Sequence, residues 1–181
     1  MKIHLLIIFL WLSISNLIAQ EIDVPDFTYN NKGSKVEYAD VIQLPGVSSQ
    51  QIYERAENWI NTFYKNPKGV IQEKIPESGK IRGEHRFPVY KMVKKDKMQN
   101  GNMKYTIVIA AKDGRYRYII SNIYKLTSPK VYIEEWVEME QHDEATAYTL
   151  TQIDEFFITL IDDLVEAMAQ PLEDDTNDDD W

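Results

Sequence analysis

The chain has 181 residues, of which 44% are hydrophobic and 27% are charged, and its formal net charge at pH 7 is −9. This length and composition predict one soluble globular domain with tails, and they exclude collagen-like, low-complexity and polytopic membrane proteins. The chain contains no Cys. That absence excludes disulfide staples, Cys nucleophiles, Cys-ligated zinc and iron–sulfur clusters.

The first 19 residues have the pattern of a secretory signal peptide. Lys2 supplies the positive start, residues 5–12 (LLIIFLWL) supply the apolar core, and Ala19 is a small residue at the predicted cleavage point. An uncleaved anchor is the alternative, but the uncharged run of residues 5–20 is shorter than the roughly 20 apolar residues that a spanning helix needs. No Cys is present for lipoprotein anchoring. The sequence therefore predicts a periplasmic or secreted protein that begins at Gln20 and has no membrane span after cleavage.

The segment after the signal predicts a lead-in, a strand and a helix. Residues 20–34 are rich in Asn, Asp, Gly and Pro, which favours a flexible lead-in. Residues 35–44 predict a strand with a bulge at 39–41. Ser48 and Gln51 have capping-box spacing, so a helix starts there. Its apolar side chains recur at helical spacing and should face a sheet: Ile52, Ala56, Trp59, Ile60 and Phe63.

Five more strands and a last helix complete the predicted domain of residues 35–170. Asp113-Gly114 is a strong signal for a two-residue hairpin turn, Pro88 indicates a bulge or an edge position in its strand, and residues 94–102 predict a polar loop. The last helix covers 149–170 with Thr151 as its cap, and the acidic residues 171–181 predict a disordered tail. The predicted strands are 70–75, 80–93, 103–111, 115–125 and 130–139.

The hairpin turn fixes which side chains share a face of the sheet. It pairs Lys112 with Arg115, and hence Ile109 with Tyr118 and Ile107 with Ile120, on an apolar face that should pack under both helices. The same turn also pairs Tyr105 with Asn122. Closing the next hairpin, onto the strand 130–139, gives further pairs on that face: Tyr118 with Val137, Asn122 with Ile133, and Tyr124 with Val131.

The opposite face of the sheet is the predicted interaction surface. It should carry apolar and aromatic groups mixed with charges, and an exposed patch of this kind often marks a binding site, although a loop or tail could equally cover it. The predicted surface consists of Val108, Arg115, Arg117, Ile119, Ile123 and Trp136, with Tyr132 beside them.

Charge is distributed in blocks along the chain. Residues 64–130 carry net +11 and residues 131–170 carry net −11. Either the basic block holds an anionic partner such as lipopolysaccharide, acidic glycan or lipid head groups, or the two blocks fold beside each other. We favour the second alternative, because the predicted register places Arg117 opposite Glu138 and Arg115 opposite Glu140.

Several local sequences resemble a known family, the secreted bacterial domains of unknown function 4468, which have a TATA-binding-protein-like (TBP-like) fold. The resemblance covers about residues 35–125 and implies an exported α+β domain with a curved antiparallel sheet, in the order β-α-β-β-β-β-β-α and with both helices on one face. It implies no activity, cofactor or catalytic residue. It rests on Leu44-Pro45-Gly46 with the Ser48 cap, Asn58-Trp59-Ile60, Val70-Ile71-Gln72, Ser78-Gly79-Lys80-Ile81 and residues 112–118 (KDGRYRY).

Signals for chemistry are weak. His85 and His142 both have acidic neighbours, but no metal-ligand spacing, nucleophile elbow or phosphate-binding loop accompanies them. Nucleic-acid binding is disfavoured by the acidic, exported chain. We therefore predict a non-enzymatic binding module of the cell envelope without metal or cofactor, whose partner is an envelope protein or a small ligand. The alternatives are a lipid or small-ligand carrier with an enclosed apolar cavity, and a hydrolase that uses His142 with nearby carboxylates. Alternation also places Glu134, Glu138 and Glu140 on one face, where a glycosidase carboxylate pair is conceivable, but their predicted arginine partners give a simpler account.

Overall fold

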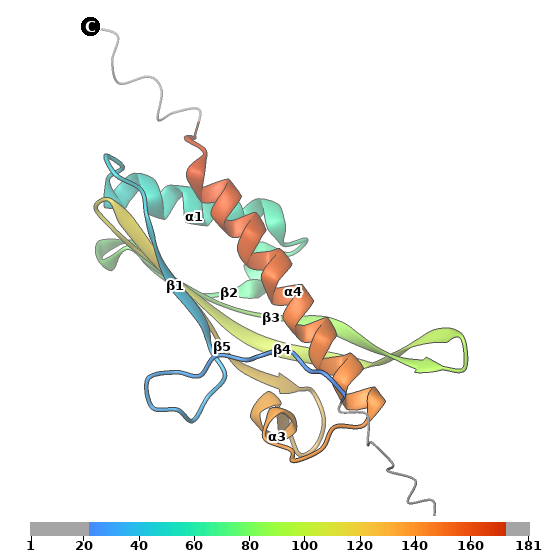
Figure 1. Ribbon diagram of the computed structural model, residues 1–181. Coiled ribbons are helices and arrows are strands. Elements are labelled where there is room, and N and C mark those ends of the chain that lie inside the picture. The colour runs from blue at the N-terminus through green and yellow to red at the C-terminus, as the bar shows by residue number, and fades with distance from the viewer. Residues whose placement is uncertain (1–21, 173–181) are drawn as a thin grey trace, which may run out of the picture.

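The computed structural model describes residues 22–172 (Figure 1). The predicted signal peptide of residues 1–19, its cleavage point and most of the acidic tail lie outside the described residues. Within residues 22–172, no helix is both long enough and apolar enough to span a bilayer.

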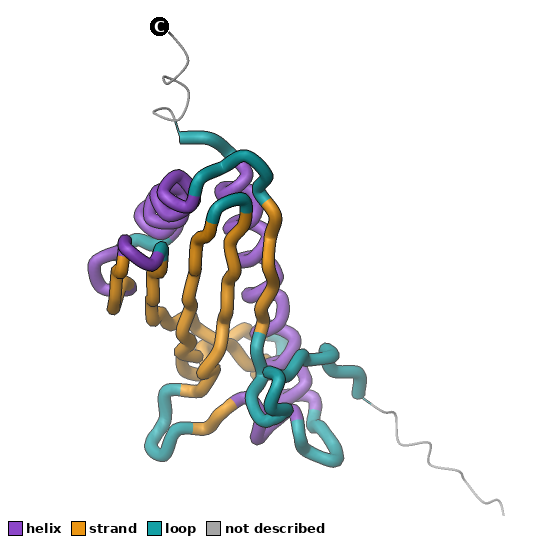
Figure 2. The backbone as a smooth tube through the Cα atoms, turned by 90° about the vertical axis from the view of Figure 1, so that its left-hand side faces the viewer, coloured by secondary structure: helices purple, strands orange, loops and turns teal. Residues whose placement is uncertain are grey.

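A six-stranded antiparallel sheet forms the centre of the domain, with main strand order β1-β5-β4-β3-β2 and β6 paired with β5. The two long helices, α1 and α4, pack on one face, and Figure 2 shows α4 running behind the strands. This confirms the predicted α+β class and the placement of both helices. The strands are β1 (Tyr38–Gln43), β2 (Ile71–Ile75), β3 (Lys80–Val93), β4 (Asp96–Lys112), β5 (Arg115–Lys125) and β6 (Val131–Tyr132).

The helices are α1 (Ser49–Phe63), α2 (Pro67–Val70), α3 (Ile133–Val137) and α4 (Glu144–Ala169), with a 3₁₀ turn at Pro76–Ser78. The capping box predicted for α1 is present, because Ser48 and Gln51 bond each other's backbone N–H groups. α4 starts earlier than predicted, since Asp143 and not Thr151 is its N-cap and accepts from the N–H of Thr146 at 2.7 Å.

The core lies between the helices and the sheet. Large side chains from both layers fill it, and each contributes about 1.5–3 kcal/mol of hydrophobic stabilisation when fully buried. Those less than 2% exposed include Trp59, Ile60, Tyr105, Ile107, Ile109, Tyr116, Ile120 and Phe157. The predicted pairs Ile109 with Tyr118 and Ile107 with Ile120 are confirmed in register and in burial.

The hairpin of β3 and β4 is longer than the sequence suggested. Residues 94–102 were expected to form a loop, but pairing continues to Val93 and Asp96, with Lys94 and Lys95 in the turn. The irregularity expected at Pro88 is confirmed, because the register shifts between Pro88 and Tyr90. The end of this hairpin projects beyond α4 (Figure 1).

The segment that was expected to form a strand at 130–139 differs most from prediction. Only Val131 and Tyr132 pair with β5, as Tyr124 with Tyr132 and Lys125 with Val131. The chain then turns into α3, where the Glu135 carboxylate accepts from the N–H of Tyr132 at 2.8 Å and so caps the helix. The predicted pairs Tyr118–Val137, Asn122–Ile133 and Tyr124–Val131 are therefore wrong, and most of β5 pairs instead with β1.

The segment before β1 is part of the fold. Phe27 is buried, with its ring 6.4 Å from that of Tyr38 in an edge-on contact, and Tyr29 forms an isolated bridge with Val36. The flexible lead-in expected for residues 20–34 thus contains a packed portion. The bulge expected at 39–41 is absent, because β1 pairs with β5 in continuous register.

Candidate functional site

The open face of the sheet is the surface that α1 and α4 leave uncovered. Side chains alternate between the two faces of a strand, so this face carries every second residue of β1, β3, β4 and β5. One row crosses four strands as Arg82, Val108, Ile119 and Ala39, which are successive partners in register. Val108 and Ile119 are half-buried at the centre of that row.

Four of the six predicted surface residues lie together on this face. Val108 pairs with Ile119, Arg115 pairs with Lys112, and Arg117 pairs with Ala110 and Val41. Val41 is 44% exposed and extends the apolar patch towards β1. We call the whole uncovered surface the open sheet face, and its central part consists of Val41, Val108, Arg115, Arg117 and Ile119.

The other two predicted residues are not on the open sheet face. Ile123 is fully buried in the core, because Asn122 adopts a left-handed conformation with φ 52° and the register shifts between Lys104 and Thr106. A bulge adds one residue to the strand, so the side chains after it point to the opposite face from the one that simple alternation predicts. Trp136 lies on α3, packs against the core, and has the Lys125 ammonium 5.9 Å from its ring centre.

The open sheet face is more basic than predicted. The acidic side chains of residues 144–166 belong to α4 on the covered side, and Glu138 and Glu140 follow α3, so the expected pairs Arg117–Glu138 and Arg115–Glu140 do not form. Arg117 instead lies 3.7 Å from Glu37. The basic residues of the sheet and the acidic residues of α4 thus lie in different layers.

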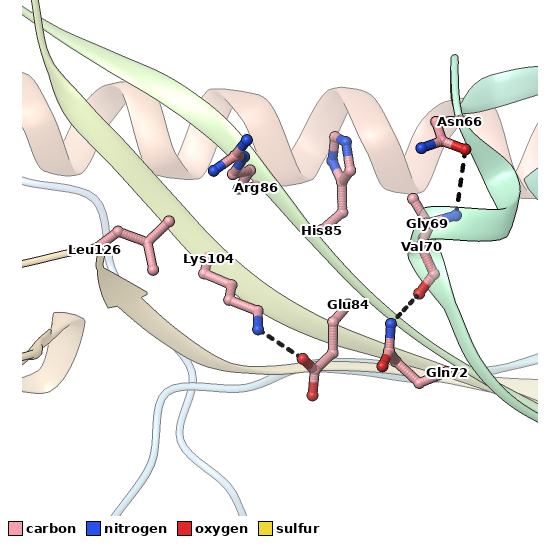
Figure 3. A pocket seen from close by; sticks show the side chains of 9 residues that line it. All are labelled: Asn66, Gly69, Val70, Gln72, Glu84, His85, Arg86, Lys104 and Leu126. Atoms are coloured by element: carbon pink, nitrogen blue, oxygen red, sulfur yellow. Dashed lines mark hydrogen bonds and ion pairs between the residues drawn. The ribbon is translucent and has the colours of Figure 1, made fainter.

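A pocket opens at the edge of the sheet where β3 runs past the end of β2 and is paired only with β4 (Figure 3). Its volume is about 550 Å³. Glu84 contacts Arg82 at 2.5 Å and Lys104 at 2.7 Å. Hydrogen bonding to Lys104, with the further contact to Arg82, lowers the pKa of the Glu84 carboxyl below its ordinary value. The lining residues are Asn66, Gly69, Val70, Gln72, Glu84, His85, Arg86, Lys104 and Leu126.

His85 is the most distinctive side chain of this pocket. Its ring lies 4.8 Å from that of Tyr64, and its Nδ1 is buried without a hydrogen-bond partner. Burial, with the positive charge of Arg86, lowers the pKa of His85 below 6.5. The sequence showed His85 between Glu84 and Arg86, but not that β2 stops short and exposes this edge.

The groups considered for catalysis are dispersed. Nε2 of His142 is 2.9 Å from the carbonyl oxygen of Trp136, a contact that holds the loop after α3 and gives the hydrolase alternative no support. Glu134 is buried and accepts from the N–H of Val36 at 2.8 Å, whereas Glu138 and Glu140 are exposed. Among the described residues there is no group of three or more His, Asp or Glu side chains that could hold a metal ion.

An antiparallel sheet with two helices on one face and an exposed basic face on the other defines a TBP-like α+β domain. The resemblance seen in the sequence is confirmed: residues 38–125 match the family described as "Domain of unknown function (DUF4468) with TBP-like fold".

Solved structures share this fold. A DUF4468 family protein from Bacteroides ovatus is 20% identical and superposes with a TM-score of 0.65 over 83% of this chain and 93% of its own. A TBP-like protein from Parabacteroides distasonis is 18% identical, with a TM-score of 0.64 over 80% of this chain and 98% of its own. No curated protein matches the chain.

Proposed function

We propose that the protein is an exported binding module of the cell envelope, which recognises a partner through the open sheet face and carries out no chemistry of its own. The observation that carries this proposal is the row Arg82, Val108, Ile119 and Ala39, where half-buried apolar groups adjoin cations on a face without a covering helix. Apolar surface next to a charged rim is the usual composition of a protein interface.

The charges on this face indicate the chemistry of the partner. Cations outnumber acids on it, so its field favours a partner with negative groups around an apolar centre. We therefore expect an acidic and partly apolar protein surface or segment. The cations include Lys80, Arg82, Arg86, Lys104, Lys112, Arg115 and Arg117, and the acids include Glu37, Glu73 and Glu84.

Site-specific photo-crosslinking in the native host tests the surface. A photoreactive phenylalanine analogue at Ile119 should give a discrete crosslinked product, and Arg115→Glu with Arg117→Glu in the same chain should remove it. The matched control places the analogue at Ile158, which is 49% exposed on α4 in the opposite layer. The surface assignment is wrong if both positions give the same products, or if Ile119 gives none.

Export is tested separately. If residues 1–19 are a cleaved signal, the intact mass of the protein recovered from the host should correspond to a chain that starts at Gln20, and the protein should fractionate with the periplasm or medium. A full-length chain recovered from the cytoplasm would contradict this part of the proposal without affecting the surface assignment.

A further inference from the structure

The tip of the β3–β4 hairpin is the most exposed apolar feature among the described residues. Eight large hydrophobic side chains of residues 22–172 are exposed. Three of them lie within seven positions of one another: Met92 at 52%, Val93 at 39% and Met98 at 49%. They share the tip with four lysines and one aspartate, so residues 91–98 (KMVKKDKM) carry net +3. We call residues 91–98 the hairpin tip.

The register distributes these groups around the whole ribbon. Met92 pairs with Lys97 and Met98 pairs with Lys91, so each exposed methionine lies directly opposite a lysine. Because side chains alternate along a strand, Met92 points to one face of the ribbon and Val93 to the other. Apolar and basic groups therefore surround the tip, and docking one face on a rigid protein would leave the other in water.

The tip is held away from the acidic body of the molecule. The last tie between the hairpin and α4 is at Tyr90, whose N–H donates to Gln152 at 3.0 Å and whose carbonyl accepts from Gln152 at 2.9 Å. Lys94 lies four residues beyond that tie, about 13 Å at the rise of an extended strand. This exceeds the Debye length of about 8 Å at physiological salt, so acidic groups close to the tie act only weakly on Lys94 and Lys95.

The chemistry at the base of the tip fits a boundary between a polar and an apolar medium. The Lys97 ammonium lies 4.4 Å from the ring centre of Tyr90, which places a cation and an amphipathic ring side by side. Tyr side chains favour the head-group level of a bilayer, and lysine stems extend through apolar surroundings to keep the ammonium in water.

We propose that the hairpin tip docks the protein on an anionic lipid bilayer, with Met92, Val93 and Met98 entering the boundary between head groups and acyl chains while Lys91, Lys94, Lys95 and Lys97 contact the lipid phosphates. Binding of this kind combines buried apolar area with electrostatic attraction to anionic lipids. It is separate from the open sheet face, because the tip is the far end of β3 and β4, which extends past the last residues paired with β5 (Figure 1).

Vesicle co-sedimentation tests the proposal. The chain from Gln20 onward keeps every described residue and omits the apolar residues 5–12, which would bind lipid by themselves. It should bind vesicles that contain phosphatidylglycerol about tenfold or more tightly than pure phosphatidylcholine vesicles. Lys94→Glu with Lys95→Glu should remove that difference, and Met92→Ser with Met98→Ser should weaken binding to the anionic vesicles.

The matched control is Lys65→Glu with Lys68→Glu, the same charge change at exposed positions outside the tip; it should stay within about twofold of the parent chain. The tip variants alter only exposed side chains, and unchanged thermal unfolding will show that they fold. Equal binding to neutral and anionic vesicles, no binding to either, or unchanged binding by the Lys94 and Lys95 variant would overturn the proposal. So would binding to soluble polyphosphate without binding to vesicles, because it would show that lipid is not the ligand.

Discussion

The carboxylate of Glu134 on α3 accepts a hydrogen bond of 2.8 Å from the backbone N–H of Val36, 98 residues earlier in the chain. Both residues are buried. The contact joins the packed segment before β1 to α3, which follows β6, and so it holds the start of the edge strand β1. A charged acceptor makes this hydrogen bond stronger than one between neutral groups.

Removal of this acceptor should destabilise the fold. In Glu134→Ala the Val36 N–H stays buried without a partner, which costs about 1–3 kcal/mol of unfolding free energy. Urea denaturation measures the loss. Glu134→Gln keeps an acceptor oxygen and should lose less, and Glu140→Ala, an exposed change on the following loop, should lie within about 0.5 kcal/mol of the parent. Equal stability of the Glu134→Ala and Glu140→Ala variants would contradict the role given to this contact.

The bulge at Asn122 predicts unequal effects at two isoleucines four residues apart. Ile123→Ala removes a fully buried side chain and should cost about 2–5 kcal/mol. Ile119→Ala removes a half-buried side chain from the open sheet face and should cost less. Denaturant unfolding of both variants checks the order. A larger loss at Ile119 would mean that the two faces of β5 are assigned the wrong way round.

The arginines of the open sheet face should contribute little to folding. Arg117 is half exposed and lies 3.7 Å from Glu37, and pairs of this kind contribute about 0–1 kcal/mol. Arg115→Ala and Arg117→Ala should therefore leave the unfolding free energy nearly unchanged while they reduce crosslinking from Ile119. A drop in stability that accompanies the loss of crosslinking would indicate a structural role instead.

His85 should make stability depend on pH. Burial and Arg86 lower its pKa in the folded state below 6.5, so the unfolded state binds the proton more tightly. The part of the unfolding free energy that depends on neutral His85 is fully present above pH 6.5. It decreases as the pH falls through 6.5 towards the pKa of His85 in the folded state. NMR titration of the His85 ring should give a midpoint below 6.5, and His85→Gln should reduce the loss of stability between pH 7 and pH 5.5. A midpoint at or above 6.5 would contradict the burial argued for this ring.

Local signals were sufficient for much of the fold. Asp113-Gly114 fixed the β4–β5 register down to Ile107 and Ile120, and the Ser48 and Gln51 pattern located the start of α1. Both are short-range effects that depend on a few neighbouring residues, so they can be recognised without knowing the rest of the fold.

The errors came from competition between local patterns and distant partners. Tyr132 and Glu135 have the spacing of a helix cap, and two glutamates in the first turn favour a helix start, but the apolar alternation of residues 130–139 favoured a strand. On the edge of β5 that does not pair with β4, the partner is β1. The whole of α1 and three strands separate β1 from β5 in the sequence, and no turn signal indicates such a pairing. Asn122 gave no clear sign of its left-handed conformation, so Ile123 was placed on the wrong face.

The two hydrogen bonds between the Gln152 amide and the Tyr90 backbone block part of an exposed strand edge, and so they limit pairing of this edge with another molecule. Where β3 runs past the end of β2, its outer edge is a template to which another chain could add a strand. The Gln152 amide occupies both backbone groups of Tyr90, and Pro88, two residues earlier, has no N–H to offer. Together they leave only a short run of this edge open to a neighbour. Gln152 thereby protects a long, projecting hairpin from fibre-like stacking while its tip stays exposed.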